Sequence, residues 1–523
     1  MSHHKVFSTD NYIPTTADWI GFVGMVVGMF MAILDIQIVA SSINEIQAGL
    51  SATPDEATWI QTSYLIAEVI MIPLSGWLAR AFSTRYLFLL SCGGFTIMSI
   101  ACAFAWNLDS MILFRALQGF FGGAMIPTVF SVIYGFFPRR LKPALSAIVG
   151  LVVTLAPSTG PVIGGWITDN ISWHALFTIN IIPGILVCFT TLFYAKFDEP
   201  DWSLIKKIDI WGIIYVGVFL GCLQYVLEEG TRNDWFNSRK IIMFSSVSAL
   251  GAFLFLVHEL SCKHPIIDLF AFKDRNFAAG CLFSFILGWG LYNVVFLTPV
   301  YLSQVKGLNS QQIGFYVAVM GMFQFLMAPV SAGLSKKADL RKMSAFGMAV
   351  FGIGCIMNSR LSYDSGYWEF FFPQMVRGVG VMFAIIPVNL IAMGTLPPQE
   401  VKNASGLYNL TRNLGGAIGL AVTGTFLQDW PKSHYAVLRE HITDTSVKAL
   451  SLIENFSDYL SSLNVVKPDD AIIKILYGIA QREASIMTFN DIFYVMGLMF
   501  ILSLIALPLI TVINPTKEAA EVH

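Results

Sequence analysis

Residues 20–43 have the sequence IGFVGMVVGMFMAILDIQIVASSI, and Asp35 is the only charged residue among them. A helix needs roughly 20 consecutive apolar residues to cross the hydrocarbon core of a bilayer. This stretch is long enough, and a carboxylate inside it is costly in lipid and is therefore a candidate functional group. The stretch indicates a membrane-spanning helix with an ionisable group in its interior.

Similar apolar stretches recur along the whole chain of 523 residues. Charged residues make up 13% of the chain, whereas soluble domains contain roughly 25%. The net charge of −2 gives no indication of a nucleic-acid partner. The sequence predicts an all-α polytopic membrane protein with about 14 transmembrane helices. The candidate spans are 20–43, 58–79, 86–105, 108–136, 141–166, 174–196, 209–226, 240–260, 277–303, 312–334, 342–360, 367–395, 403–428 and 486–513.

The distribution of Lys and Arg predicts the orientation, because these residues concentrate in cytosolic loops. With a cytosolic N-terminus, 18 of the 32 Lys and Arg residues lie on the cytosolic side and 5 in short outer loops. Residues 1–19 and 514–523 are then cytosolic tails, and the long segment 429–485 lies outside.

Three ionisable residues in the first four spans lie at similar depth. Helix rise places Asp35 at ~12 Å, Glu68 at ~15 Å and Arg115 at ~10 Å from the outer ends of their spans. We expect them to face one another or a wet cavity and to form a proton site, because burial raises the proton affinity of a carboxylate and a nearby Arg lowers it. The alternative is an ion pair that fixes helix packing. For Arg377 and Arg412, substrate binding and packing are equally supported.

The two ends of the chain contain a similar short pattern. Residues 115–119 (RALQG) precede Pro127 in the fourth span, and residues 374–378 (QMVRG) precede Pro387 in the twelfth. Arg and Gln exchange places, but the glycine and the later proline are kept. Repeated halves are common in transporters, where they build a central site.

The fifth span contains the sequence APSTGPVIGG at residues 156–165. Prolines bend a helix by removing backbone donors, and glycines allow close helix contacts. Together with Gly150, this run resembles the antiporter motif of drug exporters of the major facilitator superfamily. We expect it to act as a seam between the inward-open and outward-open states.

Three further motifs are similar to those of the same family. Residues 115–119 resemble the fourth-helix motif, whose Arg the family links to proton coupling. Residues 34–39 (LDIQIV) resemble the first-helix motif of fourteen-helix drug:proton antiporters. Residues 76–79 (GWLA) with Arg85 resemble the loop motif between helices two and three, and 333–341 a degenerate second copy. Among subgroups, the chain looks most like EmrB-type pumps of Gram-negative bacteria.

The resemblance implies a major facilitator fold with two six-helix bundles, at 20–196 and 277–513. Two extra central helices occupy 197–276, and a periplasmic insertion occupies 429–485. It implies proton-coupled efflux of hydrophobic or amphiphilic molecules across the bacterial inner membrane, with a periplasmic adaptor protein and an outer-membrane channel as partners. A dedicated exporter of a native metabolite or siderophore, or a facilitator or importer of the same fold, is the alternative.

The site residues expected from these arguments fall into three groups. The proton-coupling group is Asp35, Glu68 and Arg115. The substrate-cavity group is Gln37, Tyr64, Gln118, Tyr292, Asn293, Arg377 and Arg412. The conformational gating group is Gly76, Arg80, Arg85, Gly160, Pro161, Gly164 and Gly165.

Four positions depart from the family pattern. Arg80 stands where the loop motif usually has an acid, and Ser83 where it has a glycine. The family's acid caps a helix in the other half, so the usual gating lock is in doubt. Gln37 and Ala40 replace the usual Thr and Asn of the first-helix motif, which alters the lining around Asp35.

Other function classes lack their motifs. The sequence contains no HExxH, no GxSxG and no GxxxxGK[ST], so neither an enzyme nor an ATP-driven pump is indicated. The eight histidines are scattered, and the seven cysteines lie in or beside apolar runs without a CxxC pair. We therefore expect no cofactor and no metal site.

The outer segment 429–485 has two apolar stripes at roughly helical spacing, which predict two amphipathic helices outside the membrane. They act either as a lid over the outer mouth or as a docking face for a periplasmic adaptor. The first stripe is Val437, Leu438, Ile442, Val447, Leu450, Ile453, Phe456, Leu460 and Leu463. The second is Ile472, Ile473, Leu476 and Ile479.

Overall fold

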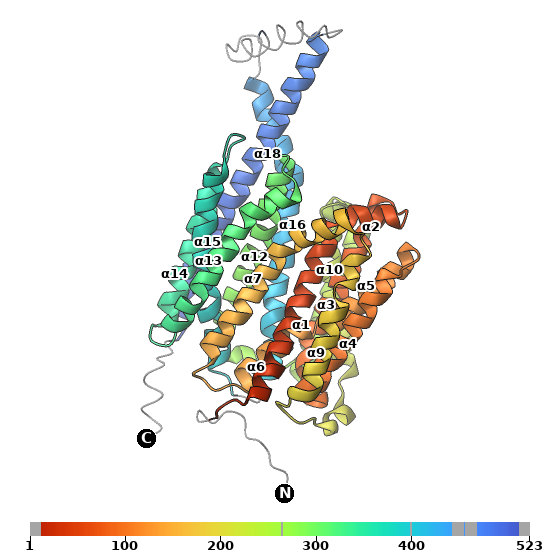
Figure 1. Cartoon of the computed structure of the whole chain (residues 1–523), viewed down its shortest axis with the longest axis vertical. Coiled ribbons are helices and arrows are strands. Elements are labelled where there is room, and N and C mark those ends of the chain that lie inside the picture. Colours follow the sequence, from red (N-terminus) through yellow and green to blue (C-terminus); the bar gives the residue numbers. More distant parts are fainter. Residues whose placement is uncertain (1–11, 263–264, 398–399, 442–453, 455–467, 512–523) are drawn as a thin grey trace.

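The computed structural model describes residues 12–262, 265–397, 400–441, 454 and 468–511, and every regular element in this part of the chain is helical. The helices form one elongated bundle (Figure 1). We call the end at which α1 begins and η5 ends the terminal face. The opposite end, from which α16 and α18 project well beyond the other helices, is the hairpin face.

The N-terminal half contains six membrane helices, two of which are interrupted. Its elements are α1 (Thr16–Ser41), α2 (Ile43–Gly49), α3 (Pro54–Phe82), α4 (Thr84–Ala103), α5 (Leu108–Gly122), α6 (Met125–Gly135), α7 (Lys142–Asn170), α8 (Ala175–Thr178) and α9 (Ile181–Tyr194).

Two accessory helices follow, and they attach to the outside of this half. α10 packs against α3, and α11 packs against α10. The elements of this region are η1 (Trp202–Lys207), α10 (Ile210–Glu229), η2 (Trp235–Asn237), α11 (Arg239–Ser261) and η3 (Leu269–Lys273).

The C-terminal half contains six long helices, the last two of which extend beyond the bundle. Its elements are α12 (Arg275–Gln304), α13 (Ser310–Leu334), α14 (Leu340–Met357), η4 (Asn358–Arg360), α15 (Tyr367–Gly394), α16 (Val401–His441), α18 (Pro468–Leu502) and η5 (Ser503–Leu509).

Thirteen helical segments in the described part of the chain are long and apolar enough to cross a membrane. They correspond to thirteen of the fourteen predicted spans. The remaining one, 403–428, lies in α16, which packs against α12, α18 and α3 inside the bundle. α16 is more polar than the others because Asn409, Arg412 and Asn413 line an internal cavity. The prediction of about fourteen helices is therefore confirmed.

The outer segment differs from the two separate helices predicted for it. Residues 429–441 continue α16, and residues 472–479 belong to α18. The two helices contact each other through Tyr435 and Tyr477, whose ring centres are 5.3 Å apart. We call this pair, 429–441 with 468–485, the outer hairpin. Several predicted stripe positions (Ile442, Val447, Leu450, Ile453, Phe456, Leu460 and Leu463) lie outside the described residues.

Side-chain caps explain where several helices begin. Thr15 and Asp18 form a capping box at the start of α1, and Thr53 and Glu56 form one at the start of α3. Each box satisfies backbone NH groups that have no partner within the helix. The long apolar runs between such caps then have no alternative to helix in lipid, because every backbone polar group must be bonded internally.

The two halves meet along four helix contacts. α7 packs against α13 and α15, and α16 packs against α3 and α6. Several functional residues expected from the sequence, among them Glu68, Gly76 and Arg412, lie on these helices.

Candidate functional site: a buried ion pair beside a central cavity

Asp35 of α1 and Arg115 of α5 form an ion pair in which both side chains are 0% exposed, with 2.6 Å between Arg115 Nη1 and Asp35 Oδ2. Arg115 Nε donates to the Ile60 carbonyl at 3.3 Å, and the guanidinium lies 4.3 Å from the centre of the Tyr64 ring. A buried ion pair offsets its desolvation only when further bonds satisfy both partners. These contacts satisfy Arg115 Nε and Nη1 and place Arg115 between α1 and α3, whereas Nη2 has no hydrogen-bond partner among the described residues.

Amide side chains complete the network on the other Asp35 oxygen. Oδ1 accepts from Asn180 Nδ2 at 2.7 Å and from Gln118 Nε2 at 3.2 Å. Gln118 Oε1 accepts from Arg115 at 2.7 Å. Ser99 Oγ of α4 accepts from both amides, at 2.9 and 3.2 Å. We call these five residues the Asp35 network; it joins α1, α4, α5 and the start of α9.

Sequence reasoning predicted three members of this network and missed two. Asn180 is a polar residue inside the apolar span predicted at 174–196, and that position alone marks it as a candidate. Ser99 gives a weaker signal, because a serine inside a membrane helix often bonds its own backbone. Here it donates instead to the Phe177 carbonyl of another segment, at 2.9 Å.

Glu68 lies outside the network and faces a cavity of about 70 Å³ between the two halves. Its side chain is buried, and it has no hydrogen bond or ion pair with any described residue. The cavity is lined by Ile33, Ile36, Gln37, Leu65, Glu68, Ile72, Ile126, Pro127, Val153, Pro157, Gln224, Glu228, Tyr292, Asn409, Arg412, Asn413, Ala417 and Leu420. It is therefore mostly apolar, with a few carboxylate, amide and guanidinium groups.

The accessory helix α10 contributes two cavity residues that the sequence analysis did not select. Gln224 Nε2 donates to Glu228 Oε1 at 2.9 Å, and both side chains line the cavity. The predicted span ended at residue 226, which left Glu228 in an outer loop. The helix continues to Glu229, and this brings a second carboxylate into the central site.

The seven residues predicted for the substrate cavity separate into three groups. Gln37, Tyr292 and Arg412 line the cavity. Tyr64 and Gln118 belong to the Asp35 network or contact it. The remaining two, Asn293 and Arg377, are buried within the C-terminal half and do not line the cavity.

Arg412 is held in place by the C-terminal half and touches the other half. Its Nη2 donates to Asn389 Oδ1 at 2.9 Å. The guanidinium lies 5.0 Å from the Tyr408 ring centre and 5.3 Å from that of Phe130, which belongs to α6 of the N-terminal half. Arg412 is thus a cation at the plane between the halves.

The predicted gating glycines lie at two different helix contacts. A Cβ on Gly76 would lie 2.6 Å from the Lys402 carbonyl, so Gly76 allows α3 to approach α16 of the other half. Cβ atoms on Gly160 and Gly164 would clash with Gln37 and Ser41 of α1. These two glycines therefore pack inside the N-terminal half, against α1, and their role as a seam between the inward-open and outward-open states stays a prediction. Pro161 and Gly165 are half-buried on the same helix.

An ion pair joins the two halves at the terminal face. Asp198, which follows α9, pairs with Lys402 at the start of α16. Asp198 Oδ1 also accepts from the Thr84 backbone NH at 3.0 Å, at the start of α4. We call this pair the Asp198–Lys402 lock. It supplies an acid between the halves although Arg80 occupies the family's usual acidic position.

The two predicted gating arginines lie near this lock without forming it. Arg80 lines a second cavity with Lys207 and Asp268. Arg85 donates to the Leu192 carbonyl of α9 and is thereby tied to the N-terminal half. Neither side chain bonds to the C-terminal half in the described part of the chain.

Comparisons with known proteins agree with this architecture. The sequence profile of the Major Facilitator Superfamily matches residues 25–420. The chain is 39% identical over 479 residues to the colistin resistance protein EmrB of Acinetobacter baumannii, covering 92% of this chain and 93% of that one. It is 31% identical over 425 residues to the multidrug export protein EmrB of Escherichia coli K12, covering 81% and 83% respectively.

A solved structure of the proton:xylose symporter XylE has the same arrangement of helices. The TM-score is 0.58 at 12% identity, and the alignment covers 94% of this chain and 95% of that one. At this identity the likeness concerns the fold alone. With its profile match and its EmrB relatives, the chain belongs to the Major Facilitator Superfamily and, within it, to the EmrB group.

Proposed function

We propose that the protein exports lipophilic or amphiphilic small molecules in exchange for protons. The observation that carries this proposal is Glu68, a buried carboxylate without a bonded partner, on the wall of a cavity between two movable halves. Relatives named for multidrug export and colistin resistance support the substrate class. The mostly apolar cavity lining suits the same class.

Within this proposal, the two acids have different roles. Asp35 is already neutralised by Arg115 and two amides, so it positions α1 against α5 and α9. Glu68 has no such partner and faces the cavity, so it is the group that takes up a proton from one side and releases it to the other. Protonation then biases the balance between two conformations, as ligand binding does in any two-state protein.

The size of the cavity indicates that transport requires the halves to move apart. Small-molecule sites usually enclose about 300–1,000 Å³, and the space here is about 70 Å³. Cargo therefore enters after rearrangement of the contacts between α3 and α16 and between α7 and α13. Opening toward the terminal face also requires the Asp198–Lys402 lock to break.

Proteoliposomes with an imposed pH gradient test the proposal. Glu68→Gln should reduce gradient-driven export of a fluorescent lipophilic cation to background, while binding of that cation persists. The matched control is Glu229→Gln, because Glu229 is a buried acid near the cavity that bonds Thr58 and Arg232 instead. Gradient-driven export by the Glu68→Gln variant at the wild-type rate would contradict the proposal. If the transport rate of the wild-type protein did not depend on the pH gradient, the protein would be a facilitator.

The proposal also includes a location and partners. The excess of Lys and Arg at the terminal face supports cytosolic termini in a bacterial inner membrane. The outer hairpin then projects into the periplasm, where it suits docking of an adaptor protein that connects to an outer-membrane channel. Ile473 and Tyr477 of the hairpin are 65% and 50% exposed, which leaves apolar surface for such a partner.

Shortening the outer hairpin separates docking from gating. The variant replaces residues 429–485 with a short flexible linker. Docking predicts that adaptor co-purification and cellular resistance are lost while transport in proteoliposomes persists. Loss of transport in proteoliposomes as well would assign the hairpin to the transporter's own gate.

A further inference from the structure

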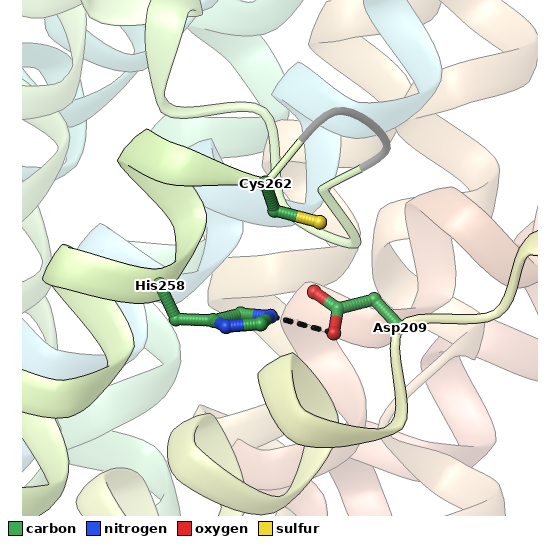
Figure 2. A group of neighbouring side chains, drawn as sticks. All are labelled: Asp209, His258 and Cys262. Atoms are coloured by element: carbon green, nitrogen blue, oxygen red, sulfur yellow. Dashed lines mark hydrogen bonds and ion pairs between the residues drawn. The ribbon is translucent and has the colours of Figure 1, made fainter.

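Three side chains with different metal-binding atoms converge where α10 begins and α11 ends, at the terminal face (Figure 2). Asp209 precedes α10, His258 lies in the last turn of α11, and Cys262 follows that helix. Their carboxylate oxygen, imidazole nitrogen and thiol sulfur all lie within 4.8 Å of one another. His258 and Cys262 are four residues apart, a spacing that puts them on one helix face.

Helix capping accounts for only one of the two Asp209 oxygens. Oδ1 accepts from the Gly212 NH at 2.9 Å and pairs with His258 Nε2 at 2.7 Å. Oδ2 is buried and has no hydrogen-bond partner among the described residues. The Asp209 side chain as a whole is 6% exposed. In Figure 2 this oxygen lies on the side of the carboxylate nearer Cys262. An unsatisfied buried carboxylate oxygen is costly.

A second buried carboxyl group, that of Glu259, lies beside Asp209. Glu259 is 2% exposed, and its carboxyl group lies beside the backbone NH groups of Ile266 and Ile267. Both carboxylates flank Gly212: a Cβ there would overlap Asp209 Oδ2 and lie 2.9 Å from Glu259 Oε1. Asp209 and Glu259 thus place two buried carboxyl groups beside the imidazole of His258.

We infer that Asp209, His258 and Cys262 bind one divalent cation of the zinc class. Oxygen, nitrogen and sulfur donors together suit a borderline-soft metal, and Mg²⁺ or Ca²⁺ would select oxygen donors alone. Tetrahedral zinc ligands lie ~3.3–3.8 Å apart. The two atoms of the Asp209–His258 pair, 2.7 Å apart, therefore separate slightly when the metal binds, and the thiol moves inward.

The bound metal would fasten α11 to α10 at the terminal face. α11 packs chiefly on α10, so a metal bound by one residue of α10 and two of α11 fixes their ends at the terminal face. His258 and Cys262 are partly exposed, which leaves access for exchange and a solvent position for a fourth ligand. In the proposed orientation this end faces the reducing cytosol, where the thiol is free to bind metal.

Cobalt(II) titration of the full-length protein tests the inference directly. The protein carries no affinity tag, and its background is His3→Ala with His4→Ala, because those imidazoles bind the same metals. One equivalent of Co²⁺ should produce a thiolate-to-cobalt band in the near ultraviolet, and Zn²⁺ should displace it. Cys262→Ser should abolish the band, and Cys222→Ser, which removes a thiol from the middle of α10, should keep it.

Zinc affinity measured by competition supplies the second readout. Asp209→Asn and His258→Gln should weaken binding at least about tenfold, because even ligand-supporting residues contribute that much. Melting temperatures without metal show whether each variant is folded. The inference fails if the wild-type band is absent or survives unchanged in Cys262→Ser. Neither measurement involves transport, so both test the metal site independently of the proposed export function.

Discussion

Arg115 and Arg377 occupy similar places in the two halves, yet their surroundings differ. Both side chains are 0% exposed. Arg115 pairs with Asp35 and bonds Gln118 and the Ile60 carbonyl. Arg377 lies 5.5 Å from the Phe493 ring centre, and none of its three nitrogens has a hydrogen-bond partner among the described residues. One arginine is compensated by an acid, and the other is surrounded mostly by apolar groups.

The packing around the two arginines is nevertheless alike. A Cβ on Gly119 would clash with the Tyr64 carbonyl of α3, and one on Gly378 would lie 2.6 Å from the Met320 carbonyl of α13. α3 and α13 are each the second long helix of their half. The repeat detected in the sequence therefore preserves a helix–helix contact. Among the described residues, the buried arginine of this repeat pairs with an acid in the N-terminal half only. α12 has no acidic residue corresponding to Asp35 of α1.

The largest expected effect is that of removing the compensated arginine. Arg115→Met leaves Asp35 buried without its counter-charge, which costs about 3–5 kcal/mol. We expect loss of gradient-driven transport in proteoliposomes and a large drop in melting temperature. Adding Asp35→Asn should restore part of the stability and none of the transport. Recovery of transport in that double variant would show that the Asp35 network serves only to pack the helices together.

The shared glycine contact should be equally sensitive in both halves. Gly119→Ala and Gly378→Ala each force a helix away from a neighbouring backbone, at a cost of about 1–3 kcal/mol. Thermal unfolding in detergent measures both, with Gly333→Ala as the control because no atom lies within 4 Å of a Cβ there. A destabilised Gly119→Ala beside an unaffected Gly378→Ala would break the structural equivalence of the halves.

The smallest effect is expected from the uncompensated arginine. Arg377→Met replaces a buried cation with an apolar side chain of similar length, an exchange that is often neutral or stabilising. Transport should stay within about twofold of wild type, and the melting temperature should stay level or rise. Strong transport loss with intact folding would show that Arg377 meets a charged partner, substrate included, in another conformation.

The sequence predicted features that depend on local composition. The lengths of the apolar stretches predicted the spans. The similar depths of Asp35 and Arg115 in their spans predicted that the two residues lie close together. Features that depend on helix rotation were not predictable. Gly160 faces α1 and not the other half, and Glu68 lines the cavity instead of pairing with Arg115. Glu228 was missed because the end of α10 was placed three residues early. Asp198 and Lys402 meet only through the fold, since more than two hundred residues separate them.

α16 connects distant parts of this molecule mechanically. It runs for 41 residues from Val401, past Arg412 at the cavity, to the outer hairpin, although Pro431 removes one backbone donor along the way. At 1.5 Å per residue its length is about 60 Å. A tilt of about 5° around the Lys402 end therefore displaces the far end by about 5 Å. In the proposed orientation the helix would act as a lever, and the position of its far end would indicate whether the Asp198–Lys402 lock at the other end is closed.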